Sequence, residues 1–188
     1  MWGIEADRAI YERMLSNIRA AAPEAADRFT PLFGFSQKVI PSWLAEQGPD
    51  ATVDVAFLDG GDNPFEQITE FQLLADCIPI GGQLLAHDAK LRKGKWLRPY
   101  LGQLDNWSVE LHDVSDEGLL RAVKLRAAPS ASSRRKAAAL LRRLRLQPAE
   151  LIGRLLPSRV NQVLLQMMPR TLRAQVSQGR PPAGKPPR

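Results

Sequence analysis

The sequence predicts an α/β protein in which a layered sheet is followed by a basic helical extension. Strand and helix patterns alternate along the first two thirds of the chain and close with a hairpin, as in sheets with crossover helices. The distribution of charge changes at the same place. Residues 1–128 carry 13 Lys and Arg and 19 Asp and Glu, whereas residues 129–188 carry 13 Lys and Arg and a single acidic residue. We therefore expect an acidic α/β domain over 1–128 and a separate basic unit after it.

The composition is that of a globular protein whose 188 residues are enough to bury a core. A hydrophobic fraction of 44% and a charged fraction of 24% exclude a collagen and a wholly disordered chain. Cys77 is the single cysteine, which excludes an intrachain disulfide and a cysteine-built zinc site. The sequence therefore fits a reducing compartment, and we expect a cytoplasmic protein.

The first half of the α/β domain contains two predicted helices and two predicted strands. Apolar residues recur every three or four positions over 7–22, which predicts a helix with one buried face. The apolar stretch 29–33 predicts a strand, and a helix is expected over 36–44. The segment 53–58 is the clearest strand, and its near-continuous apolarity predicts a strand covered on both faces.

The second half of the domain alternates in the same way and then closes. A proline at the start of 64–76 favours a helix there, and 83–86 reads as a short strand. A helix is expected over 96–104. Strands over 107–111 and 119–125 are joined by a polar turn, which predicts a terminal hairpin.

The basic extension, residues 129–178, is predicted to consist of short helices. Ser132 or Ser133 can cap a helix over 134–146, and three prolines divide the remainder into helical pieces. Residues 179–188 contain four prolines and no large apolar side chain, so we expect a disordered tail there.

Four segments of the α/β domain together form a recognisable pattern, namely Gly3–Asp7, Gly34–Pro41, Val55–Gly60 and Gly81–Asp88. They resemble class I S-adenosylmethionine-dependent methyltransferases, in particular the catechol O-methyltransferase-like branch of small-molecule O-methyltransferases. Their order and spacing match the second to fifth strands of that family, with the turns that follow. The resemblance covers residues 1–126 and implies a Rossmann-like sheet with S-adenosylmethionine as cofactor.

The resemblance also implies that part of the family sheet is missing. Nothing in the sequence matches the first strand or the glycine-rich loop, whose backbone amides bind the methionine part of the cofactor. The chain is either an N-terminally truncated fragment or a short protein with a rearranged sheet. In both cases we expect weak or no binding of S-adenosylmethionine, and a version extended upstream should gain binding if it supplies such a loop.

Three residues are implied to hold the cofactor. Glu5 would accept hydrogen bonds from the ribose hydroxyls, since a carboxylate can hold two neighbouring hydroxyls. Ser36 and Gln37 would contact the adenine. Alternatively, Glu5 is an exposed acid near the chain end, and Ser36 is a helix cap.

Asp59 and Asp88 are implied to bind a divalent metal ion. In metal-dependent members of the family, acids at these strand ends hold an ion, and hard oxygen ligands favour Mg²⁺. The sequence departs from the catechol enzyme, since His87 stands where that enzyme has a carboxylate and Asp88 where it has an amide. Asp62 falls at the position of its catalytic lysine. Alternatively, the two aspartates cap the segments that follow them.

His87 and Asp62 are the candidate catalytic residues. The imidazole of His87 could take a proton from a hydroxyl, act as a third metal ligand, or simply hydrogen-bond at the end of its strand. Asp62 could be a base, a ligand or the cap of the helix that follows. Arg92, Lys93 and Lys95 could recognise a phosphate or carboxylate on the acceptor, or form a solvated loop.

The sequence supports two principal functions. The first is O-methylation of a small-molecule hydroxyl acceptor, and the alternative is a non-catalytic remnant that binds a partner. The extension adds a third hypothesis, in which its cations bind an anionic membrane or RNA. The extension could instead pack on its own acidic body or on a second subunit in a homo-oligomer. The cations are Arg134, Arg135, Lys136, Arg142, Arg143 and Arg145.

Overall fold

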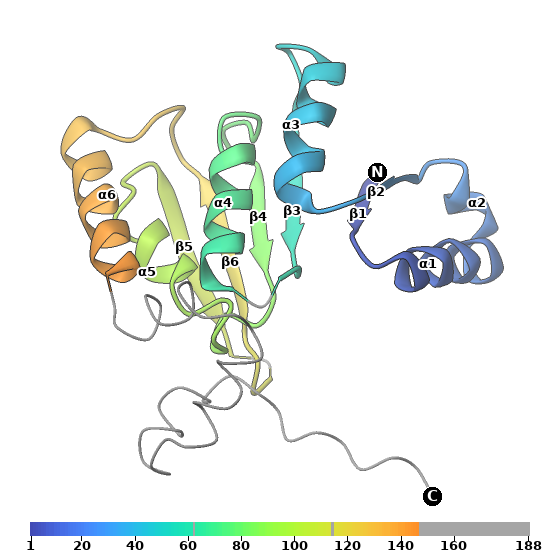
Figure 1. Cartoon of the computed structure of the whole chain (residues 1–188). Coiled ribbons are helices and arrows are strands. Elements are labelled where there is room, and N and C mark those ends of the chain that lie inside the picture. Colours follow the sequence, from blue (N-terminus) through green and yellow to red (C-terminus); the bar gives the residue numbers. More distant parts are fainter. Residues whose placement is uncertain (62, 114, 147–188) are drawn as a thin grey trace, which may run out of the picture.

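The computed structural model describes residues 1–61, 63–113 and 115–146, and these residues form two sheets (Figure 1). Strand β1 (Trp2–Glu5) pairs in parallel with β2 (Thr30–Phe33). The larger sheet has the order β3-β4-β6-β5, in which β3 (Val55–Leu58) and β4 (Gln83–Ala86) are parallel. The hairpin of β5 (Trp107–His112) and β6 (Leu119–Lys124) is antiparallel and places β6 beside β4. The predicted α/β class is confirmed.

The N-terminal sheet carries α1 (Arg8–Ala21) and the short α2 (Pro23–Ala26). The predicted helix over 7–22 is confirmed, and its cap is Asp7, whose side chain accepts hydrogen bonds from the backbone N–H groups of Ala9 and Ile10 at 2.8 and 3.0 Å. Its predicted buried face is only half-buried, and Ile10 is 52% exposed. The reason is that, among the described residues, α1 packs mainly against the two short strands and α2.

Helix α3 (Ser36–Gln47) connects the two sheets (Figure 1). Its buried residues are Ile40 and Trp43. The Trp43 ring meets Trp2 of β1 edge to face, with ring centroids 5.1 Å apart, and α3 also packs along α4 (Pro64–Leu74). Aromatic pairs of this geometry add to the burial of apolar area. The N-terminal sheet is therefore attached to the larger one mainly through α3.

Helix α4 begins with a capping box formed by Asn63 and Glu66. The Asn63 side chain accepts a hydrogen bond from the Phe65 N–H at 2.9 Å, and Glu66 accepts one from the Asn63 N–H at 3.3 Å. The expectation that Asp62 caps this helix is wrong, because the N-cap residue is Asn63. Asp62 itself lies outside the described residues, as do its proposed roles as base or ligand.

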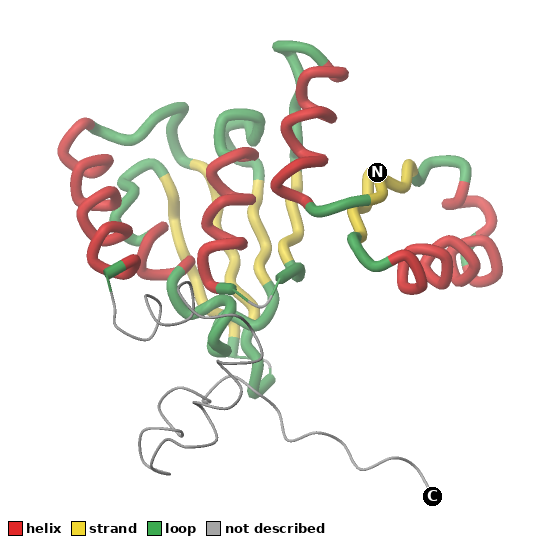
Figure 2. The backbone as a smooth tube through the Cα atoms, in the orientation of Figure 1, coloured by secondary structure: helices red, strands yellow, loops and turns green. Residues whose placement is uncertain are grey.

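The larger sheet buries one face against helices, and α4 crosses that face in Figure 2. The buried strand residues on this face include Leu58, Leu84 and Leu120. On the other face Val55 and Phe57 are 55% and 57% exposed. The prediction that segment 53–58 is covered on both faces is therefore wrong, because apolarity alone does not reveal which helices are available to cover a strand.

Two further helices complete the helical layer. Helix α5 (Leu97–Leu101) is shorter than the predicted 96–104 and is followed by Gly102. Helix α6 (Ala131–Arg145) confirms the helix expected over 134–146, but its cap is Ser130 rather than Ser132 or Ser133. Ala137 and Leu144 of α6 belong to the same hydrophobic core as the sheet. The first helix of the predicted extension therefore packs on the acidic domain.

Asp105, in the turn before β5, binds the residues at the start of α6. Its carboxylate accepts a hydrogen bond from the Ser130 N–H at 2.9 Å and lies 3.0 Å from Arg126. The hydrogen bond from the Ser130 backbone, aided by Arg126, lowers the pKa of Asp105 to about 2. The Ser133 hydroxyl, in turn, accepts a hydrogen bond from the Asp105 N–H at 2.9 Å. The join at residues 126–130 is thus an ordered connection between α6 and the sheet.

The rest of the predicted extension, including the tail over 179–188, lies outside the described residues, and the division of the chain into three parts stays a prediction. Within the part of the chain that the structure describes, no helix is both long and apolar enough to cross a membrane.

Candidate functional site

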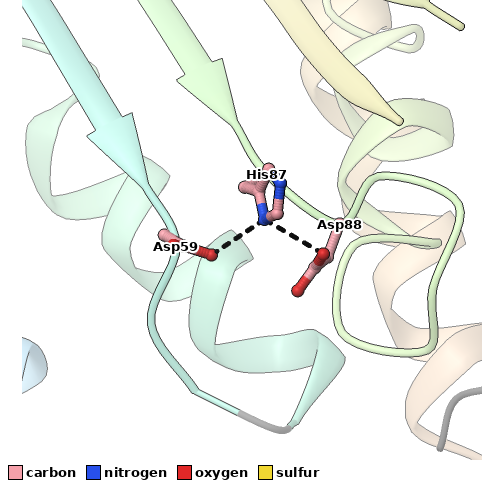
Figure 3. Close-up of side chains that lie close together, drawn as sticks. All are labelled: Asp59, His87 and Asp88. Carbon is pink, nitrogen blue, oxygen red and sulfur yellow. Dashed lines mark hydrogen bonds and ion pairs between the residues drawn. The ribbon is translucent and has the colours of Figure 1, made fainter. Parts of the chain in front are cut away.

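An acid–histidine cluster lies where β3 and β4 end side by side (Figure 3). The parallel register pairs Leu58 with Ala86, so that Asp59 and His87 leave the sheet at the same level. The His87 N–H donates to the Leu58 carbonyl at 2.9 Å, which extends the pairing by one step. Asp88 follows with a positive φ of 58°, a conformation that turns the chain sharply.

The imidazole of His87 stands between two carboxylates. Its Nδ1 lies 3.2 Å from Asp59 Oδ1 and 3.0 Å from Asp88 Oδ1, and its Nε2 lies 3.4 Å from Glu117 Oε2. Because ionised carboxylates can only accept, they favour the tautomer with the proton on Nδ1. The same reasoning applies to Nε2, which faces Glu117 Oε2, so Nε2 can take a proton from an acceptor only where the acceptor hydroxyl displaces that carboxylate. Glu117, from the turn before β6, was not anticipated, although that turn is visibly acidic in the sequence.

Lys93 reaches into the same cluster from the loop after β4. Its Nζ lies 3.0 Å from Asp59 Oδ1 and 2.7 Å from Asp88 Oδ2, and it also donates to the Asp59 carbonyl at 2.7 Å. Burial lowers the pKa of Lys93, but the hydrogen bonds to the two aspartates outweigh burial and raise this pKa above its usual value. Lys93 is thus bound to the acids, and neither alternative for it, recognition of a phosphate or carboxylate or a place in a solvated loop, matches these contacts.

Three of these residues are potential ligands of a divalent metal ion. Asp59, His87 and Asp88 each offer one ligand atom, and the three atoms lie within 4.8 Å of one another. Two carboxylates and an imidazole are suitable ligands. However, the Lys93 ammonium is hydrogen-bonded to both carboxylates, where an ion would have to bind. In this arrangement the residues do not accommodate Mg²⁺.

Ser36 and Glu70 form a buried polar contact beside the cluster. Ser36 is the first residue of α3, and its hydroxyl donates to the carboxylate of Glu70 on α4, which is 4% exposed. Phe35 occupies the N-cap position of α3, so the alternative role of Ser36 as the cap is wrong. Burial raises the pKa of Glu70, although the Ser36 hydroxyl opposes this effect. Glu70 was not anticipated, although an acid between the apolar residues Ile68 and Phe71 is the sequence feature that could have indicated a buried carboxylate.

The predicted cofactor ligands are not all brought together. Glu5 ends β1 in the N-terminal sheet, and its Oε1 accepts a hydrogen bond from the Asp7 N–H at 2.7 Å. Gln37 follows Ser36 in α3. A hollow of about 380 Å³ lies between β2 and α3, but neither Ser36 nor Gln37 lines it. The cofactor roles of Glu5, Ser36 and Gln37 therefore stay predictions.

The sequence matches no protein-family model, and no curated protein matches it. Solved structures do match. The O-methyltransferase TomG from Streptomyces achromogenes, determined in complex with SAM, gives a TM-score of 0.55 at 13% identity over 66% of this chain and 61% of that one. An O-methyltransferase from Bacillus cereus in complex with SAH gives a TM-score of 0.50 at 15% identity, over 65% of this chain and 61% of that one. An rRNA methylase from Streptococcus thermophilus gives a TM-score of 0.52 at 12% identity, over 66% of this chain and 73% of that one.

The chain has the fold of the class I S-adenosylmethionine-dependent methyltransferases. It spans 61% of TomG and 61% of the Bacillus protein, which is less than two thirds of either. In this methyltransferase fold the cluster of Asp59, His87 and Asp88 stands at the carboxyl ends of two parallel strands, the edge at which open α/β sheets bind ligands.

Glu70 makes stability depend on pH. Because the pKa of Glu70 is higher in the folded state, the folded protein retains the proton of this carboxyl group to a higher pH than the unfolded chain does. The free energy of unfolding therefore falls as pH rises from about 4.5 through the folded pKa. Glu70→Gln keeps an acceptor for Ser36 and removes the charge. We expect it to raise the free energy of unfolding at pH 7 by about 1 kcal/mol and to have no such effect at pH 4. Urea unfolding at both pH values measures this.

The exposed Glu46→Gln on α3 is the matched control, and it should leave stability unchanged at either pH. A Glu70→Gln protein that is less stable than the parent at pH 7 would show that the buried carboxylate is favourably ionised.

Proposed function

We propose that the protein is an S-adenosylmethionine-dependent methyltransferase that acts on a hydroxyl group of a small molecule. The observation that carries this is the position of His87 at the carboxyl ends of β3 and β4, where its Nδ1 faces Asp59 and Asp88. An acceptor hydroxyl that displaced the Glu117 carboxylate would reach its Nε2. The fold supports the class of reaction. Structures of the same fold were determined with SAM or SAH, and two of those cited are O-methyltransferases.

The chemistry of the site follows from these contacts. S-adenosylmethionine, when bound, supplies a methyl group on a positively charged sulfur. Transfer of this methyl group to the acceptor oxygen would break its bond to sulfur and leave a neutral thioether. His87 Nε2 would accept the hydroxyl proton, and Asp59 and Asp88 would stabilise the resulting imidazolium. Glu5 would hold the ribose, while Ser36 and Gln37 would lie against the adenine. The remaining requirement is alignment of the acceptor with the methyl group, which is a matter of positioning.

His87→Asn tests the base. Removing a general base typically costs about 100-fold or more in rate. In a version extended upstream that binds the cofactor, we therefore expect at least this loss in kcat for methyl transfer to a panel of phenolic and sugar hydroxyls, with SAH binding unchanged. His112→Asn is the control, because His112 lies on β5 and pairs with Glu110 at 3.5 Å. Equal activity of the His87→Asn and parent proteins would remove His87 from the mechanism.

Cofactor binding by residues 1–188 alone is expected to be weak. Among the described residues β1 pairs only with β2, and β3 only with β4, so Glu5 and Asp59 belong to separate sheets. We infer that a strand lying between β1 and β3 would be needed to bring both residues to one cofactor. Calorimetric titration with SAH should show no micromolar binding by this chain. Binding should appear in a version extended upstream if the added segment supplies the glycine-rich loop.

Micromolar affinity of the 188-residue chain would contradict this expectation. An extended protein that still fails to bind SAH would favour the alternative, a non-catalytic module with a methyltransferase fold.

A second candidate function, RNA binding, is favoured by the packing of α6. Leu144 is buried and Leu140 and Leu141 are half-buried against the core, so α6 has lost the apolar face that a membrane-surface helix needs. Its cations are nevertheless exposed, which suits a phosphate backbone. The exposed cations are Arg134, Arg135, Lys136, Arg142, Arg143 and Arg145.

Replacing Arg134, Arg135 and Lys136 together by Gln should weaken binding of a short single-stranded RNA. The slope of log affinity against log salt should become shallower by about 2, since each lost phosphate contact contributes roughly 0.7. The control replaces the exposed Arg13 and Arg19 of α1, together with the exposed Arg28 that follows α2, by Gln. Equal slopes for all three proteins would exclude α6 as the RNA contact, and binding to anionic vesicles instead would identify a membrane partner.

A further inference from the structure

The contacts of Lys93 use its whole hydrogen-bonding capacity. An ammonium has three N–H groups, and Nζ has three acceptors within 3.0 Å, namely the carbonyl and Oδ1 of Asp59 and Oδ2 of Asp88. The side chains of Lys93 and Asp88 are only 16% and 14% exposed. Lys93 therefore has no donor left for a substrate, and its role is directed at the two carboxylates.

The loop after β4 is tightly folded, and its conformation places Lys93 beside the carboxylates of Asp59 and Asp88. The Leu91 N–H donates to the Asp88 carbonyl at 2.9 Å, and the Lys95 N–H donates to the Leu91 carbonyl at 3.0 Å. A Cβ on Gly94 would lie 2.3 Å from the Asp88 carbonyl oxygen, so only glycine permits this approach. The neighbouring residue, Lys93, is thereby turned back over the acids that precede it.

The charges explain why an ammonium and a divalent ion cannot share the site. Asp59 and Asp88 together carry two negative charges within hydrogen-bonding distance of His87 Nδ1. Left uncompensated, these carboxylates would repel each other, since like charges in a partly buried site are poorly screened. Lys93 supplies the compensating charge. A metal ion bound to the same oxygens would lie within a few ångströms of the ammonium, and repulsion would drive one of the two cations out.

We propose that Lys93 is a built-in cation that takes the place of a divalent metal ion between Asp59 and Asp88. Lys93 is a positioning residue, because it holds the two carboxylates that orient His87. The site consequently works without Mg²⁺, and removing the ammonium uncovers a metal site with Asp59, His87 and Asp88 as ligands. The inference concerns the site of the proposed function, but its test measures metal binding and does not depend on methyl transfer.

The test is a titration with Mn²⁺, followed by the loss of the free-ion signal in electron paramagnetic resonance. The parent protein should bind no Mn²⁺ at millimolar concentration. Lys93→Met, which keeps the length of the side chain and removes its charge, should bind one ion at least tenfold more tightly. Adding Asp88→Asn to Lys93→Met should abolish the gain.

Lys90→Met is the matched control, since Lys90 lies in the same loop but pairs with Asp113 and should create no site when replaced. Circular dichroism establishes that each variant is folded, and Lys93→Gln replaces Lys93→Met if the latter is not. Stoichiometric binding of Mn²⁺ by the parent protein that is lost in Asp88→Asn would overturn the proposal. So would folded Lys93→Met and Lys93→Gln proteins that bind Mn²⁺ no better than the parent.

Discussion

The parallel pairing of β3 with β4 is the constraint on which the candidate site depends. It ends both strands at one level and so places Asp59 beside His87, although 28 residues separate them in the chain. A register slip of one residue would turn every side chain of β4 to the opposite face. Helix α4 secures the arrangement from the buried side, since the amide nitrogen of the fully buried Gln67 donates to the His87 carbonyl at 3.2 Å. The geometry of the site is thus set by backbone pairing and by one buried side chain.

Those parts of the structure that depend on local pattern were predictable from the sequence. The strand over 83–86 was predicted with its observed bounds, and the helix over 7–22 differs from α1 by one residue at each end. Each of these segments combines a regular apolar pattern with a clear stop signal. The approach of Asp59 to His87 was also predictable, because residues that follow neighbouring parallel strands emerge at the same edge of the sheet.

The contacts that were not predictable join residues far apart through loops of irregular geometry. The sequence left open whether Lys93 recognises an acceptor or belongs to a solvated loop, yet the positive φ of Asp88 and the close approach of Gly94 turn it inward. Ser36 meets Glu70 across 34 residues, and this contact depends on how α3 lies along α4. Neither propensity nor periodicity carries information about such an arrangement. Whether a strand is covered on one face or two is likewise decided by the rest of the fold.

The exposed apolar residues of β3 and the separation of the two sheets have one physical origin. In the described residues β1 and β3 each use only one edge for pairing, and α3 spans the distance between them. Open edges and exposed apolar side chains such as Val55 and Phe57 are unfavourable in a monomer in water. A parallel strand between β1 and β3 would pair both edges and join the sheets. It would also bring Glu5 into one sheet with Asp59, so completion of the sheet and assembly of the cofactor site would be a single event.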